Sequence, residues 1–258
     1  MKTSNKYSQS IWEDYYTGER KIHLKPKTGL FSSYDIYLCD YLIQRYIPRF
    51  KNGKITEIGS GDGKLLKKVA GMLNLNPIGI EYSKEAAKIA EKNGVKTIVT
   101  DAFNKDFLKE YGNHFDVVFS YGFVEHIIPP EDAVRIHLEI LKPGGYFFIQ
   151  IPRFKGFNYW KMKFFRPDLI PLHNFEIMEK NKLEKICMTK NVQKIYSGNY
   201  GTLKLRIPID KKNYKYYILK IITTLDYLLN PLMRLFLQEK GFETWLFSPA
   251  TIFIGRKK

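Results

Sequence analysis

The chain has 258 residues, and its 42 Lys+Arg against 26 Asp+Glu give a formal net charge of +16. With 44% hydrophobic and 15% aromatic residues the chain can bury a core, so its composition excludes global disorder. The length predicts one large α/β domain with an elaboration, or at most two small domains. The excess positive charge fits an acidic partner (nucleic acid, an anionic membrane or a phosphorylated substrate) or lysines spread over a solvated surface.

Cysteine usage and the apolar stretches restrict the protein further. Cys39 and Cys187 are far apart and lack metal-ligand spacing, so we expect no disulfide framework and no metal site. Residues 1–16 are polar and acidic, unlike a signal peptide. The apolar stretch 216–237 is interrupted by Lys, Asp, Pro and Arg, whereas a spanning helix needs roughly 20 apolar residues without such breaks. We therefore expect a cytoplasmic protein.

Strand-like and helix-like runs alternate from residue 54 onward. Helical spacing occurs in KLLKKVAGML, in KEAAKIAEK, and over about 131–141 and 176–190. Ser83 is a good N-cap for the second of these helices, and Asn93-Gly94 is a good stop signal for it. A turn is expected at KPGG. The runs typical of strands are ITEIG, PIGIEYS, VKTIVTDAF, FDVVFSYG, YFFIQIP, a segment near VQKIYSG, and ATIFIGRKK.

This alternation predicts an α/β fold with a Rossmann-like, doubly wound, mostly parallel seven-stranded sheet and helices on both faces. In such sheets ligands bind beyond the carboxyl ends of the strands. We divide the chain into an N-terminal helical lid segment, residues 1–50, and a main domain, residues 51–258. Within the main domain, we expect substrate-covering insertions at about 152–175 and 203–245, where the pattern loses its clean period.

The loop EIGSGDGK lies where a strand turns into a helix. Gly59 permits a sharp turn, Gly61 lets a ligand approach the backbone, and Gly63 allows a helix to pack closely on a strand. A P-loop has four residues between its glycines and ends Gly-Lys-Ser/Thr, whereas Lys64 is followed by Leu65 here. The dinucleotide fingerprint places its third glycine one residue later. Both phosphate-binding motifs are therefore disfavoured.

Three carboxylates lie at the ends of the first three strands. Glu57 directly precedes the glycine loop, and Glu81 ends the second strand, where a carboxylate can accept hydrogen bonds from ribose hydroxyls. Asp101 ends the third strand, in IVTDAF, at the position where an adenine edge would lie. Acids at three strand ends would repel phosphates, so the crevice fits a positively charged nucleoside.

Together with FDVVFSYGFVEHI and LKPGGYFFIQIP, these motifs resemble those of class I S-adenosylmethionine-dependent methyltransferases over about residues 50–151. The likeness is greatest to the small-molecule branch that includes quinone-biosynthesis O-methyltransferases. It implies S-adenosylmethionine as cofactor, S-adenosylhomocysteine as product, and methyl transfer by in-line displacement. It also implies cofactor-binding residues in the loop, at the strand-end acids and in the fourth strand: Glu57, Gly59, Ser60, Gly61, Asp62, Gly63, Glu81, Tyr82, Asp101, Ala102, Ser120 and Tyr121.

Two histidines are candidates for a catalytic base. His126, after the fourth strand, is either a general base or substrate orienter, or a histidine that caps a helix or lies in the core. His173, in PLHNFEI, is either a second base or a surface histidine; by the resemblance, its segment covers the substrate pocket. Trp12 and Tyr16 have helical spacing and either fold over the cofactor as a lid, as similar segments do in relatives, or simply pack together.

The sequence leaves the methyl acceptor open. Residues 120–123 read SYGF where enzymes that methylate exocyclic amino groups of bases carry Asn/Asp-Pro-Pro-aromatic, which disfavours nucleic acid but not every RNA position. The run RFKGFNYWKMKFFR fits stacked bases, an anionic lipid head group, a nucleotide-linked sugar or a hydrophobic lid. The stretch 214–237 fits peripheral docking on an anionic membrane or burial. We expect methylation of a hydroxyl on a small-molecule, sugar or lipid-linked acceptor; the alternatives are an RNA methyltransferase and a non-catalytic S-adenosylmethionine-binding module.

Overall fold

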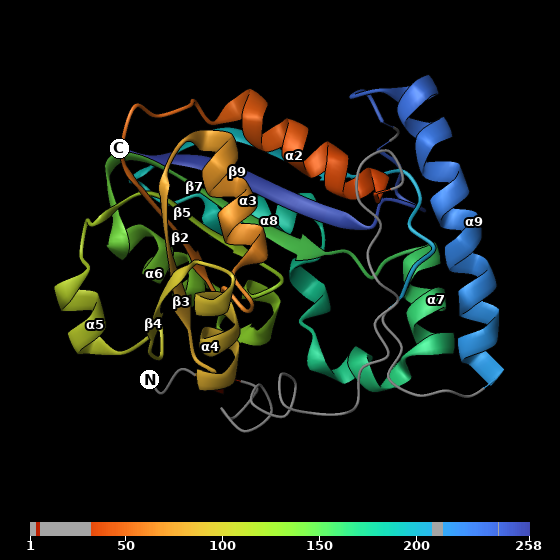
Figure 1. The fold of residues 1–258 in the computed structure, drawn as a ribbon, viewed down its shortest axis with the longest axis horizontal. Coiled ribbons are helices and arrows are strands. Elements are labelled where there is room, and N and C mark those ends of the chain that lie inside the picture. Colours follow the sequence, from red (N-terminus) through yellow and green to blue (C-terminus); the bar gives the residue numbers. More distant parts are fainter. Residues whose placement is uncertain (1–3, 6–31, 208–213, 242) are drawn as a thin grey trace.

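Seven strands form the main sheet of the computed structural model, which describes residues 4–5, 32–207, 214–241 and 243–258 (Figure 1). Their spatial order is β4-β3-β2-β5-β7-β9-β8, and β9 pairs antiparallel with both of its neighbours while the other pairs are parallel. The predicted mostly parallel sheet is confirmed. The strands are β2 (Lys54–Ile58), β3 (Asn76–Glu81), β4 (Lys96–Val99), β5 (Phe115–Tyr121), β7 (Leu141–Pro152), β8 (Val192–Tyr200) and β9 (Ala250–Lys257).

Helices cover both faces of this sheet, as predicted, and each face has its own apolar core. One core joins the sheet to α2 (Tyr34–Tyr46), α3 (Lys64–Leu73) and α4 (Lys84–Lys92). The other joins it to α5 (Lys105–Glu110), α6 (Pro130–Ile140) and α8 (Lys180–Cys187). The helices that follow β2 and β3 cover one face of the sheet, and those that follow β4 and β5 cover the other. The strand order changes direction at the same place: β3 and β4 continue on one side of β2, whereas β5 and β7 lie on its other side. That switch point is where open α/β sheets bind ligands.

The capping signals read from the sequence are present at α4. The hydroxyl of Ser83 accepts a hydrogen bond from the backbone N–H of Ala86, at 3.1 Å. The helix ends at Lys92, and Gly94 follows with a φ of +80°, in the left-handed region that favours glycine. The predicted start and stop of this helix are confirmed.

The segment predicted as an N-terminal lid is in part a core helix. Tyr34, Leu38 and Ile43 of α2 are buried against the sheet, so residues 34–46 belong to the main domain. Ser4–Asn5 form β1, which pairs antiparallel with β6 (Ile127–Ile128), directly after His126. Trp12 and Tyr16 lie outside the described residues.

Three other boundaries differ from the sequence interpretation. The expected KPGG turn lies inside β7, where the pairing with β5 shifts register between Phe115 and Val117. The third strand is shorter than expected and ends at Val99, and the helix expected over 176–190 is confined to α8 after a 3-10 turn, η4 (Phe175–Ile177).

Three elements beyond β7 build the walls of a second cavity described below. They are α7 (Phe157–Phe165), the 3-10 helix η3 (Pro167–Leu172), and the segment 201–207. The long helix α9 (Tyr214–Leu237) lies at the edge of the molecule beside α7 (Figure 1). None of the described helices combines the length and the apolarity needed to cross a membrane.

Candidate active site

The glycine loop has a backbone that only glycine adopts readily. Gly59, Gly61 and Gly63 have φ angles of +75°, +54° and +73°. A Cβ on Gly63 would also lie 3.0 Å from the side chain of Val95 and 3.1 Å from that of Ala90. The turn therefore favours glycine at all three positions, and the predicted roles of Gly59 in the turn and of Gly63 in close packing are confirmed. The approach of a ligand at Gly61 stays a prediction.

Glu81 ties this loop to the end of β3. Its Oε2 accepts a hydrogen bond from the N–H of Gly61 at 2.7 Å, and its Oε1 accepts from the N–H groups of Tyr82 and Ser83 at 2.8 Å each. The Gly59 N–H also donates to the carbonyl of Ile80 at 2.9 Å. One buried carboxylate thus fixes the position of the loop relative to the neighbouring strand end.

A cavity of about 240 Å³, here called the glycine-loop cavity, lies beyond the carboxyl ends of β2, β3 and β5. It brings together residues that are far apart in the sequence, as the strand-end argument predicted. Seven of the predicted site residues line it: Gly59, Glu81, Tyr82, Asp101, Ala102, Tyr121 and His126. The remaining lining residues are Ile58, Ile80, Thr100, Phe103, Gly122, Phe123 and Ile127.

The other predicted cofactor residues lie behind or beside this cavity. Ser120 is fully buried, and its hydroxyl lies 3.0 Å from Nε2 of His137, beneath the site. Asp62 is partly exposed and pairs with Lys64 at 2.6 Å. Gly61 and Gly63 shape the loop, while Ser60 is buried in it. Direct contact of these residues with a cofactor stays a prediction, and for Ser120 the geometry disfavours it.

Glu57 is the buried acid behind the loop. Burial, reinforced by the nearby carboxyls of Glu81 and Asp62, raises its pKa well above the usual range. Its Oε2 has no hydrogen-bond partner among the described residues. Because an unpartnered buried carboxyl oxygen is unfavourable, this position is suited to a ligand that brings a positive charge or a donor.

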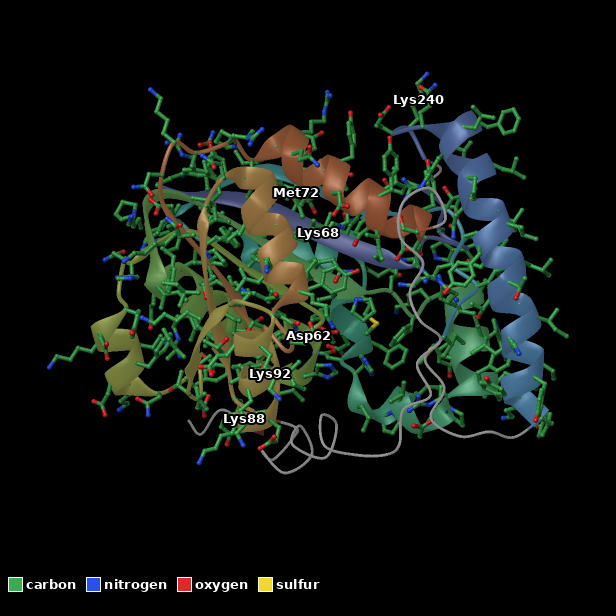
Figure 2. The ribbon with its side chains drawn as sticks, in the orientation of Figure 1. Asp62, Lys68, Met72, Lys88, Lys92 and Lys240 are labelled. Carbon is green, nitrogen blue, oxygen red and sulfur yellow. The ribbon has the colours of Figure 1, made fainter. Side chains whose placement is uncertain are left out.

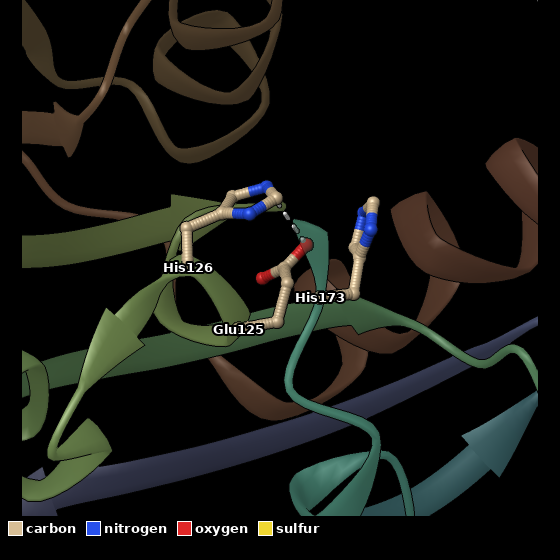
Figure 3. A group of neighbouring side chains, drawn as sticks. All are labelled: Glu125, His126 and His173. Atoms are coloured by element: carbon tan, nitrogen blue, oxygen red, sulfur yellow. Dashed lines mark ion pairs between the residues drawn. The ribbon is translucent and has the colours of Figure 1, made fainter. Parts of the chain in front are cut away.

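A second cavity of about 470 Å³, here called the adjoining cavity, shares Tyr121, Gly122 and His126 with the first. Its walls come from β7, α7, η3 and the segment 201–207. Within it, Glu125, His126 and His173 form a cluster, with the two imidazole rings 4.7 Å apart (Figure 3). Sequence spacing alone did not predict that the two candidate bases would meet.

Backbone carbonyls orient both histidines of this cluster. Nδ1 of His126 lies 3.0 Å from the carbonyl oxygen of Leu172, and Nδ1 of His173 lies 2.7 Å from that of Leu169. A carbonyl accepts only, so each Nδ1 carries a proton, and in a neutral imidazole Nε2 then carries the lone pair. Nε2 of His126 lies 3.8 Å from Oε1 of Glu125. His126 can therefore accept a proton at Nε2.

Glu125 is the residue of this cluster that the sequence interpretation missed. It is fully buried, burial raises its pKa to about 8, and its Oε2 has no partner among the described residues. The ligand atoms of Glu125, His126 and His173 lie within 4.8 Å of one another, so the group can also hold a metal ion, which the sequence gave no reason to expect. The dipeptide Glu125-His126 was visible in the sequence, but His173 joins it only through the fold.

A larger concavity of about 920 Å³ lies elsewhere, between α6 and α8, where Arg135, Glu139, Lys182 and Lys185 are among its lining residues. It lies on the helices of one face rather than beyond the strand ends, and it contains none of the predicted site residues. Its size alone does not make it the active site.

Comparison with known proteins agrees with this geometry. Residues 31–180, more than half of the chain, match the family model described as a methyltransferase domain. The chain belongs to this family. The resemblance to class I S-adenosylmethionine-dependent methyltransferases, and with it the cofactor, is thereby confirmed.

Curated relatives of this methyltransferase act on different acceptors. The tRNA U34 carboxymethyltransferase of Desulfotalea psychrophila is 28% identical over 107 residues, 40% of this chain and 33% of that protein. The ubiquinone biosynthesis O-methyltransferase of Proteus mirabilis is 29% identical over 99 residues, 37% of this chain and 40% of that protein. The ribosomal RNA large subunit methyltransferase E of Desulfatibacillum aliphaticivorans is 24% identical over 187 residues, 64% of this chain and 87% of that protein. The chain thus spans less than half of the first two relatives.

Solved structures share the fold at low sequence identity. An S-adenosylmethionine-dependent methyltransferase from Archaeoglobus fulgidus has a TM-score of 0.52 at 19% identity, and the match covers 97% of this chain and 100% of that one. A second from Mesorhizobium loti has a TM-score of 0.55 at 12% identity, covering 89% and 100%. These likenesses show the fold, and they do not choose an acceptor.

The residues present fit S-adenosylmethionine. The buried, unpartnered oxygen of Glu57 suits a group that carries positive charge. Gly59, which lines the cavity, has a φ of +75°, so the backbone there is exposed to a ligand in a conformation that side chains rarely adopt. Glu81, Asp101 and Tyr121 line the glycine-loop cavity from three strand ends. By the resemblance, Glu81 would hold the ribose, and Asp101 with Ala102 the adenine.

Proposed function

We propose that this methyltransferase transfers a methyl group from S-adenosylmethionine to a hydroxyl of a small-molecule, sugar or lipid-linked acceptor bound in the adjoining cavity. The observation that carries the proposal is the junction of the two cavities, where Tyr121, Gly122 and His126 line both. A donor in the first cavity and an acceptor in the second would meet beside His126. A volume of about 470 Å³ is in the range of small-molecule sites.

When bound, S-adenosylmethionine supplies an activated methyl group on a sulfonium, which departs as neutral S-adenosylhomocysteine. The bond from acceptor oxygen to methyl carbon forms while the carbon–sulfur bond breaks, so the protein has to align the two partners and remove the hydroxyl proton. His126 takes that proton at Nε2, because its Nδ1 is held by the carbonyl of Leu172. A positive charge on the imidazole would favour the ionised form of Glu125, whose Oε1 lies 3.8 Å away and whose pKa burial raises to about 8.

The test is a His126→Gln variant assayed for release of S-adenosylhomocysteine with a cell extract as the source of acceptor. We expect turnover to fall by roughly 10²- to 10⁴-fold, as for loss of a general base, with unchanged binding of S-adenosylmethionine. His114→Gln is the matched control, because His114 directly precedes β5 and so lies at the amino end of that strand, whereas His126 lies beyond its carboxyl end. Full turnover by the His126 variant would remove the base from the mechanism.

A chelator separates the base from a metal ligand. If transfer survives treatment with EDTA, His126 acts on the proton directly. If transfer is lost and Mn²⁺ restores it, the cluster of Glu125, His126 and His173 holds a metal, and the role of His126 as a base is refuted.

RNA is the second candidate acceptor, and it is supported by the net charge of +16 and by relatives named for tRNA and rRNA. Tritiated methyl groups from S-adenosylmethionine, chased into a fractionated extract, decide between the acceptors. Label in the small-molecule or lipid fraction supports our proposal, and label in RNA replaces it. Cofactor binding without transfer into any fraction would indicate a non-catalytic binding module.

A further inference from the structure

Basic side chains gather in one part of the adjoining cavity. Lys161 comes from α7, Lys204 and Arg206 from the segment 201–207, and Arg153 from the residue after β7. The remaining walls include apolar side chains: Phe154, Met162, Leu169, Leu172 and Ile207. An apolar pocket with a few convergent charges binds ligands that have both an apolar body and a charged group.

Three of these four cations already have a carboxylate partner. Nζ of Lys204 lies 2.8 Å from Oδ2 of Asp35, and Nε of Arg206 lies 3.0 Å from Oδ2 of Asp226. The fully buried Arg153 donates Nη1 to the carbonyl of Trp245 at 2.8 Å, and its Nη2 lies 3.5 Å from the carboxylate of Glu179. The charges of these cations are therefore balanced.

Lys161 differs from the other three. It donates to Oδ1 of Asn158 at 3.0 Å and to the carbonyl oxygen of Lys204, both neutral acceptors. No Asp or Glu among the described residues lies within ion-pair distance of it. Burial, together with the charge of Lys204, lowers the pKa of Lys161 to about 7. A partly buried ammonium group without a counter-ion is unfavourable until a negative charge arrives.

Other groups of the same lining also lack partners. Oε1 of Gln150 and Nε of Arg153 are buried and make no hydrogen bond with any described residue. Fully buried polar atoms are nearly always paired in folded proteins, so unpaired ones that line a single cavity indicate a polar ligand.

We propose that the acceptor carries an anionic group, a carboxylate or a phosphate, that forms an ion pair with Lys161 while its apolar part lies against Phe154, Met162 and Leu169. The proposal rests on the proposed function, in that the adjoining cavity is taken as the acceptor site. It predicts an amphiphilic acceptor of small-molecule size.

Calorimetry on the full chain saturated with S-adenosylhomocysteine tests this ion pair. The probes are 3-phenylpropionate, phenyl phosphate and the neutral 3-phenylpropionamide. We expect at least one anion to bind tenfold or more tightly than the amide, and Lys161→Met to abolish that preference. Lys163→Met is the matched control, because Lys163 is exposed on the same helix. The tighter of the two anions identifies the acceptor group.

Two results would overturn the ion pair: no measurable binding of either anion, or a preference for anions that survives Lys161→Met. Binding of S-adenosylhomocysteine is measured first. If the wild type does not bind it, the result counts against the proposed function. If the wild type binds it but has equal affinities for all three probes, the result counts against the ion pair alone. The same measurement in each variant shows that it is folded.

A separate observation concerns α9, whose polarity is the reverse of that of an ordinary surface helix. Its buried face carries Thr223, Asp226 and Asn230 together with Leu219. Oδ1 of Asp226 accepts from the N–H of Leu205 at 2.9 Å, and Oδ1 of Asn230 accepts from the N–H of Tyr34 at 3.0 Å. These contacts fix which side faces the domain.

The outward face of α9 is mostly apolar, and its side chains project away from the domain (Figure 2). Monomeric proteins rarely expose apolar patches of more than a few hundred Å² unless they bind something. Exposed Trp160 and Phe164 of α7 adjoin this face, since Lys215 of α9 donates to the carbonyl of Phe164 at 2.6 Å. The exposed apolar side chains of α9 are Tyr214, Tyr217, Ile218, Ile221, Leu225, Leu228, Leu229, Leu232, Leu235 and Phe236, and Lys220 and Thr224 are exposed beside them.

We infer that this outward face of α9 docks on an anionic lipid bilayer. Charge complementarity favours lipid over a second copy of the chain: the single acid of α9, Asp226, is buried, whereas the helix also carries Lys215, Lys220 and Arg234, and the chain has a net charge of +16. An amphipathic helix with aromatic and aliphatic residues on one side and basic residues beside them lies in the membrane interface without crossing it.

Vesicle flotation tests the docking. We expect the protein to float with vesicles of phosphatidylcholine and phosphatidylglycerol at low salt, and the triple variant Ile221→Glu, Leu225→Glu, Leu228→Glu to partition at least tenfold less. The matched control is Val99→Glu, Met188→Glu, which changes exposed apolar residues elsewhere. Absence of the wild type from the floated fraction overturns the inference, and a dimer in solution that the triple variant dissociates would show that a second copy covers the face.

Discussion

Replacing Glu81 with Gln isolates one contact that joins the glycine loop to β3. The carboxylate accepts three backbone N–H bonds, from Gly61 on one oxygen and from Tyr82 and Ser83 on the other. A glutamine amide has one acceptor oxygen. In its best orientation the amide oxygen of the glutamine keeps the two bonds from Tyr82 and Ser83. The NH₂ group of the amide then faces the N–H of Gly61, and these two groups are both donors and cannot bond to each other.

The expected magnitude follows from this count. A hydrogen bond to a charged group contributes about 1.5 to 3 kcal/mol, so loss of the Gly61 bond alone should weaken cofactor binding roughly 10- to 100-fold. Loss of an acceptor for the ribose hydroxyls would add to this effect. We expect the dissociation constant of S-adenosylhomocysteine, measured by calorimetry, to rise by at least tenfold.

Glu91→Gln is the control for this experiment, because it makes the same chemical change on the exposed side of α4. Thermal unfolding of both variants would show whether the loop change is local. An affinity of Glu81→Gln within twofold of the wild type would refute both the role of the carboxylate in positioning the loop and its assignment to the ribose.

Three further predictions follow from buried groups. Gly63→Ala should destabilise the fold by about 1–3 kcal/mol, because Gly63 has a positive φ and an added Cβ would make two contacts near 3.0 Å. Gly71→Ala on α3 should stabilise the fold by about 0.5–1 kcal/mol, because the space around Gly71 is open. Urea unfolding measures both changes. Burial lowers the pKa of His137 to about 4, so the unfolded chain takes up a proton that the folded one refuses. Stability should therefore fall by about 3 kcal/mol between pH 6.5 and 4 from this group, and His137→Gln should remove that part of the decline in acid unfolding curves. If Glu57 receives a cationic part of the cofactor, its raised pKa falls on binding, so calorimetry in buffers of different ionisation enthalpy should detect proton release that Glu57→Gln abolishes.

The parts of the site that the sequence predicted are those encoded by short-range rules. Three glycines with positive φ behind a strand, and acids at successive strand ends, fix the crevice because parallel strands end at one edge. The geometry disfavours the prediction for Ser120, where such a rule was not applied. Successive strand residues point to opposite faces: Tyr121 lines the crevice, whereas the hydroxyl of Ser120 lies 3.0 Å from Nε2 of His137 in the core.

Other features depend on contacts between distant segments. His173 meets His126 only because the carbonyl of Glu125 binds the N–H of Asn174 at 2.9 Å and holds that segment against the end of β5. The unbalanced charge of Lys161 is likewise invisible in a sequence where lysines are common. No periodic pattern marks which lysine lacks a carboxylate, because the pairing partners come from α2 and α9.

One helix connects the adjoining cavity to the apolar surface. The inward residues of α9 brace the segment that carries Lys204 and Arg206, since Asp226 lies 3.0 Å from the Arg206 guanidinium and accepts from the next backbone N–H upstream. The contacts of Asp226 therefore join α9 directly to the segment that carries the cations of the cavity. If the outward face of α9 rests on a bilayer and the adjoining cavity binds an anionic amphiphile, the acceptor would pass from the membrane into the cavity beside α9. The same helix would then bind the membrane on one side and support the cavity wall on the other. An acceptor without an apolar part would have no use for that face. Activity stimulated by vesicles for an amphiphilic acceptor, and lost in the α9 triple variant, would connect the two proposals.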